Sequence, residues 1–77
     1  MVLQCYKNRH RDSGVSAFEI GDDYIKVEFI DGPLYLYNHE VPGPRKVAAM
    51  KKLALDGVGL STYISRHVRN QYAARLR

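Results

Sequence analysis

The feature that most constrains this chain is a pair of strand-like runs, residues 24–29 and 34–37, joined by a short turn that contains a glycine. Along the first run apolar and polar side chains alternate, with Ile25, Val27 and Phe29 on the apolar side. Because successive side chains of a strand point to opposite faces, we expect one face of this strand to be buried and the other to be solvated. The two runs therefore predict an antiparallel hairpin.

The length of the turn decides which way Tyr35 and Tyr37 point. If Asp31 and Gly32 form a two-residue type I′ loop, both tyrosines face away from the core. If the loop has three residues, with Gly32 left-handed, both tyrosines join the buried face and the leucines beside them face outward. A change of one residue thus moves every side chain of the second strand to the other face, and the residues themselves leave both registers open.

The segments around the hairpin predict an α+β fold. Residues 15–20 alternate weakly and run into a Gly-Asp-Asp turn, which is typical of a strand. A loop rich in proline and glycine follows the hairpin, and Pro44 is suited to the first position of a helix that reaches about Leu55. Gly57 is a candidate left-handed cap for that helix.

A second helix is predicted near the C-terminus, capped by Ser61 or Thr62. Its apolar stripe recurs at intervals of four residues: Leu60, Ile64, Val68 and Tyr72. Residues 73–77 either extend this helix or fray. The predicted order is β-β-β-α-α, a three-stranded antiparallel sheet followed by two helices packed on one face.

The 77 residues predict a single domain at 13–77, preceded by a basic N-terminal arm at 1–12. The net charge of +4 is unevenly distributed. Residues 15–44 carry one lysine against six carboxylates, a net charge of −5, whereas residues 45–77 carry eight Lys or Arg against Asp56, a net charge of +7. Clustered cations favour a polyanion bound by the helices or the arm, although a merely solubilising surface explains the same charge.

Nothing in the composition indicates an enzyme. The single Cys5 indicates a reducing compartment, and the absence of a signal peptide or an apolar span favours a cytoplasmic protein away from membranes. His10, His39 and His67 are scattered without metal-ligand spacing. We expect no catalytic residues, no cofactor and no metal.

A set of residues spread over positions 13–72 forms a longer pattern. Its members are Ser13, Ile25, Val27, Phe29, Gly32, Tyr35, Tyr37, Val41, Pro42, Tyr63, Ile64, Val68, Arg69 and Tyr72. This pattern resembles the KTSC domain, a short module found at the C-terminus of some lysyl-tRNA synthetases and as free-standing bacterial proteins. Leu36 departs from the family, which has a polar residue there, and Ser61-Thr62-Tyr63 stands where the family has Gly-x-Tyr.

The resemblance implies that Tyr35 and Tyr37 point inward and form a core motif with Phe29 and Gly32, which favours the three-residue loop. It also implies RNA binding, to transfer RNA or to a single strand. Cations of the arm and the helices are the candidate RNA-binding residues: Lys7, Arg9, Arg11, Arg45, Lys52, Arg66 and Arg69.

Two alternatives remain open at this point. Tyr35 and Tyr37 could stack bases on an exposed sheet face instead of filling the core. The second function class is a protein interaction or homodimer through the outer sheet face, with Leu34 and Leu36 exposed and Phe18 and Ile20 beside them.

Overall fold

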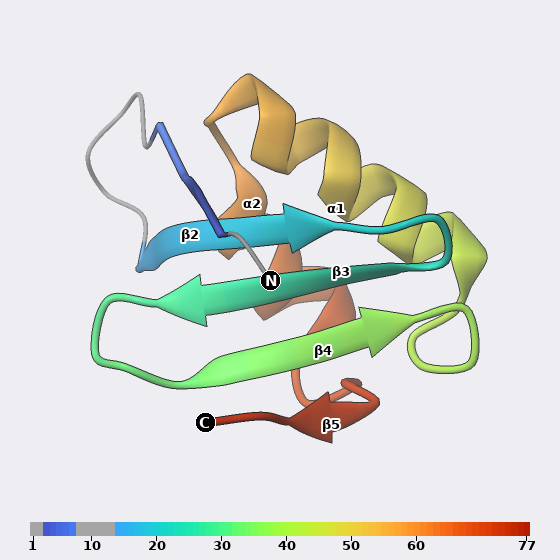
Figure 1. The fold of residues 1–77 in the computed structure, drawn as a ribbon. Coiled ribbons are helices and arrows are strands. Elements are labelled where there is room, and N and C mark those ends of the chain that lie inside the picture. The colour runs from blue at the N-terminus through green and yellow to red at the C-terminus, as the bar shows by residue number, and fades with distance from the viewer. Residues whose placement is uncertain (1–2, 8–13) are drawn as a thin grey trace.

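A computed structural model describes residues 3–7 and 14–77, in which an antiparallel sheet of five strands is covered on one face by helices (Figure 1). The strands lie side by side in chain order. Their bounds are β1 (Gln4–Cys5), β2 (Val15–Ile20), β3 (Tyr24–Phe29), β4 (Leu34–Asn38) and β5 (Ala74–Arg75). The helices are α1 (Pro44–Asp56), α2 (Leu60–Tyr63) and the π-helix η1 (Ile64–Val68).

The α+β class is confirmed, but the prediction of three strands is wrong because each end of the chain adds one more. Cys5 of β1 pairs with Ala17, and Ala74 of β5 pairs with Leu36. Each added strand is only two residues long, too short to produce an alternating pattern. The C-terminal tail therefore neither extends the second helix nor frays.

The turn between β3 and β4 has three residues. Phe29 N donates to Pro33 O at 2.9 Å, and Gly32, with a φ of 115°, donates to Phe29 O at 2.9 Å. Val27 consequently pairs with Tyr35. Of the two registers that the residues left open, the structure has the one in which the tyrosines share the buried face.

The inward tyrosines form an aromatic cluster beneath the helices. The ring centroids of Tyr35 and Tyr72 are 4.5 Å apart, and the Tyr72 ring meets Tyr37 edge-on at 6.5 Å. Phe29 packs edge-on against Tyr35 at 5.7 Å. Tyr37 is 1% exposed, and burial raises the pKa of its hydroxyl. The cluster ties the segment before β5 to the centre of the sheet.

A bulge in β2 changes which residues of that strand face the core. The register shifts between Val15 and Ala17, so both Val15 and Phe18 are buried on the helix side. Phe18 pairs with Val27. The expectation that Phe18 and Ile20 lie beside the outward leucines is therefore wrong.

The first helix begins and ends close to where the sequence predicts, whereas the second differs from the prediction at both ends. Gly57, with a φ of 75°, caps α1 and donates to Leu53 O at 3.0 Å. Gly59 caps α2 in place of Ser61 or Thr62. The buried helix residues are Val47, Met50, Ala54, Leu60, Ile64 and Val68.

Tyr72 lies beyond the end of the helical segment at Val68 and packs against the core from there. Among residues 3–7 and 14–77, no helix has the length and apolar character needed to cross a membrane.

Gly32→Ala tests the turn that fixes the register. No atom lies within 4 Å of an added Cβ, so the cost is conformational: a side chain at a φ of 115° should lower the free energy of unfolding by about 1–2 kcal/mol. Gly14→Ala is the matched control, because its Cβ would meet only Phe29 Cδ1 at 4.0 Å and φ there is not in the left-handed region. Urea denaturation of both variants measures the difference, and equal losses would contradict the assigned turn.

Candidate nucleic-acid interface

The structure places most of the predicted RNA-binding cations on the helical layer. Arg45 and Lys52 are exposed on α1, seven residues apart and therefore on one side of the helix. Arg66 is exposed in η1, and Arg69 is the first residue after the end of η1. Lys7 is exposed next to β1, whereas Arg9 and Arg11 lie outside the described residues.

The helical layer is electropositive because its cations have few counter-charges. Six Lys or Arg stand between residues 44 and 72, and Asp56 is the only carboxylate in that stretch. Two of the six have structural partners. Lys46 donates to Gln71 Oε1 at 3.0 Å, and Lys51 donates to the carbonyl of Gly21 at 2.7 Å. The other four make no ion pair with any described residue: Arg45, Lys52, Arg66 and Arg69.

The opposite face of the sheet is different, since its charges are paired. Lys26 Nζ lies 3.5 Å from Glu19 Oε2, and Arg77 pairs with Glu28. Tyr24 donates to Glu19 at 2.8 Å, and this hydrogen bond is the main cause that raises the pKa of Tyr24. A polyanion therefore meets fewer uncompensated cations on this face than on the helical layer.

The outer face also carries Leu34 and Leu36, which have the orientation that the three-residue turn requires. Leu34 is nevertheless only 3% exposed. The C-terminal segment lies alongside it, with Leu76 N donating to Leu34 O at 2.7 Å. This strand thus presents little of Leu34 to a partner, and the homodimer through this face stays a prediction.

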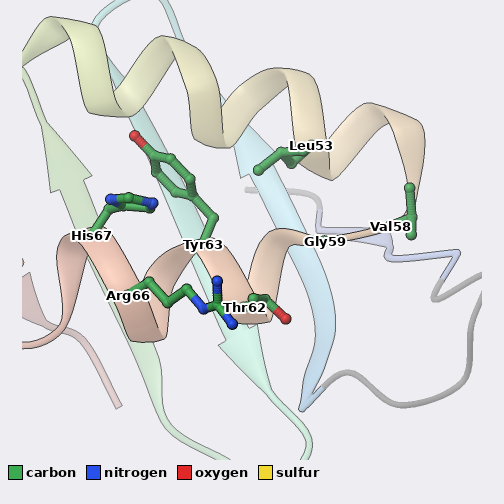
Figure 2. Close-up of a pocket in the computed structure, with 7 residues that line it drawn as sticks. All are labelled: Leu53, Val58, Gly59, Thr62, Tyr63, Arg66 and His67. Atoms are coloured by element: carbon green, nitrogen blue, oxygen red, sulfur yellow. The ribbon is translucent and has the colours of Figure 1, made fainter.

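A pocket of about 440 Å³ lies between α1 and the α2–η1 segment (Figure 2). Leu53 projects into it from α1, and the Tyr63 ring projects from the other side toward α1. Seven residues line the pocket: Leu53, Val58, Gly59, Thr62, Tyr63, Arg66 and His67.

An aromatic pair and one cation give this pocket its chemistry. The rings of Tyr63 and His67 have centroids 4.9 Å apart and planes tilted by 39°. Arg66 extends back along the helix in the direction of Thr62 (Figure 2). The pocket therefore combines a tilted pair of aromatic rings with a guanidinium that offers five hydrogen-bond donors.

Local backbone geometry sets the width of this pocket. Gly57 and Gly59 have φ values of 75° and 85°, which reverse the chain between α1 and α2 within a few residues. In η1 the turn is widened: Arg69 N donates to Ile64 O, five residues earlier, at 2.6 Å. Arg69 itself has a φ of 53°, unusual for a residue other than glycine.

The N-terminal segment also supports the pocket. The first N–H of α2, on Leu60, has no acceptor within its own helix. It donates instead to the Tyr6 hydroxyl at 3.2 Å, in a buried contact. Tyr6 is 6% exposed, so the segment next to β1 is part of the core.

The sequence prediction found Arg66 but missed the other pocket residues. The sequence did contain a signal for a shared aromatic site at Tyr63 and His67. Residues four apart share a helix face, and these two lie on either side of Arg66 in the sequence. Leu53 packs against the core and is partly exposed at the pocket.

Comparison of the chain with protein-family models, curated proteins and solved structures gives no match. The resemblance to the KTSC domain is therefore carried by the residues quoted above and stays a prediction. Within the described ranges, no three or more His, Cys, Asp or Glu side chains gather in a way that could hold a metal ion.

Tyr6→Phe tests the link between the N-terminal segment and the pocket. It leaves the buried N–H of Leu60 without its acceptor, which should lower the free energy of unfolding by about 1–3 kcal/mol. Tyr35→Phe is the control, because the Tyr35 hydroxyl makes no hydrogen bond to a described residue. If urea denaturation gave both variants the same stability, Tyr6 would not anchor α2 as described.

Proposed function

We propose that this protein is a small non-enzymatic RNA-binding module that holds a flexible single strand against its helical layer. The observation that carries the proposal is the set of cations on α1 and η1 that lack a described ion-pair partner, including Arg45, Lys52 and Arg66. Phosphates bind such cations and release condensed counterions, which makes the binding salt-dependent.

The charge distribution supports one orientation of the RNA. The cations of the outer sheet face are compensated by carboxylates, as in the Lys26–Glu19 and Arg77–Glu28 pairs. The helical layer has the fewer carboxylates and is the face we assign to RNA.

The shape of the helical layer supports single-stranded RNA, including the unpaired loops of a transfer RNA. One of these cations, Arg66, lines a pocket that also contains an aromatic pair, Tyr63 and His67. Aromatic surfaces of this kind bind unstacked bases, whereas the bases of a duplex are already stacked and are read by shape. The KTSC resemblance is consistent with the same class of ligand, and a cytoplasmic location belongs to the proposal.

The proposal is one of binding without catalysis. The pocket has a guanidinium, an imidazole and two hydroxyls, and none of its seven described lining residues is a carboxylate that would complete an acid–base pair. RNA binding does not need an acid–base pair.

Lys52→Gln tests the proposed surface. The loss of one phosphate contact should reduce the slope of log K against log salt by about 0.7, and the affinity by about eightfold at ~50 mM salt and about threefold at ~200 mM salt. Fluorescence anisotropy with a labelled single-stranded RNA measures both quantities.

The matched control is Lys26→Gln, which removes the same charge from the opposite face. It should leave the salt slope unchanged. An equal loss in the two variants would show that binding follows net charge alone, and would contradict the assignment to the helical layer.

A further inference from the structure

We propose that the pocket between α1 and the α2–η1 segment is a subsite for one unpaired nucleotide, with its base against Tyr63 and His67 and its phosphate on Arg66. This inference rests on the proposed function. It goes beyond that function because surface cations alone would bind any phosphate chain, whether or not the chain carries bases. A pocket of this composition would distinguish a strand that carries bases from one that does not.

The two walls of the pocket fit a flat ring. The Tyr63 ring packs against His67 and projects from the α2–η1 segment, and the Leu53 side chain projects from α1 (Figure 2). A base between Tyr63 and Leu53 would contact an aromatic ring on one face and an aliphatic chain on the other. The volume of about 440 Å³ lies within the range of small-ligand sites.

The polar groups lie where a nucleotide needs them. Arg66 is exposed and makes no ion pair or hydrogen bond with a described residue, so its donors are free to bind a phosphate in a bidentate manner. Thr62, one helical turn earlier, places a hydroxyl on the same rim. None of the seven described residues that line the pocket is a carboxylate that would repel the phosphate.

The backbone gives independent support. Arg66 and His67 belong to η1, and π-helical turns occur frequently at functional sites. The same segment ends at Arg69, whose φ of 53° and ψ of −119° place a residue other than glycine in a sparsely populated conformation. The π-helical turn thus coincides with the pocket residues Arg66 and His67, and the unusual conformation of Arg69 follows directly after that turn.

The test compares two labelled strands of equal length, an oligoadenylate and its fully abasic counterpart. Both carry the same phosphates, so any difference in affinity comes from the bases. A single stacked base should make oligoadenylate bind about five- to 150-fold more tightly to the unaltered protein. Equal affinities would overturn the subsite and leave the proposed function standing, whereas no binding of either strand at low salt would overturn both.

Variants then identify the residues that cause the preference for oligoadenylate over the abasic strand. Tyr63→Leu should remove the preference for oligoadenylate with the salt slope unchanged, whereas Arg66→Gln should reduce the salt slope by about 0.7 for oligoadenylate. Tyr24→Leu, on the outer sheet face, is the control and should retain the preference. Because Tyr63 is partly buried, the exposed His67→Ala serves as the second variant, and an undiminished preference in both would overturn the assignment.

Discussion

The three-residue turn at residues 30–32 fixes how β3 pairs with β4, and much of the remaining structure depends on that pairing. It turns Tyr35 and Tyr37 toward the helices, where Tyr72 packs against both rings. Tyr72 in turn holds the chain beside β4, so that Ala73 N donates to Leu36 O at 2.7 Å and β5 follows. In the other register the leucines would take the core positions, and the C-terminal segment would have no aromatic cluster to pack against.

The pocket in turn depends on the N-terminal segment. Tyr6 accepts the hydrogen bond of Leu60, which fixes the start of α2. The position of α2 sets that of η1 and therefore of Arg66 and His67, while Leu53 faces them from α1. A segment near the N-terminus thus packs close to the proposed binding surface, which depends on contacts between distant parts of the chain.

Much of the fold could be predicted because it depends on local patterns. Alternation located β3, Pro44 located the start of α1, and Gly57 its cap. The stripe of Leu60, Ile64 and Val68 is buried as its spacing requires. These features follow from side-chain periodicity and from backbone preferences of single residues, which a sequence shows directly.

The rest could not be predicted because it depends on tertiary contacts. β1 and β5 are two residues long and exist through pairing with strands already formed. The bulge near Ser16 reverses the faces of β2 without any glycine or proline to mark it. Likewise the pocket requires the packing of α1 against η1. Among its side chains the sequence singled out Arg66 as a binding candidate, and a solvated helix flank explained that residue equally well.

An amide NMR titration of the labelled protein with a single-stranded RNA tests the central claim, that the helical layer is the binding surface. It would be recorded at about 50 mM and about 200 mM salt. We predict salt-dependent shifts at Lys52, Tyr63, Arg66 and His67, with the amides of the outer-face residues Glu19 and Lys26 unchanged. Shifts confined to the outer sheet face, or no shifts at the lower salt concentration, would contradict the account.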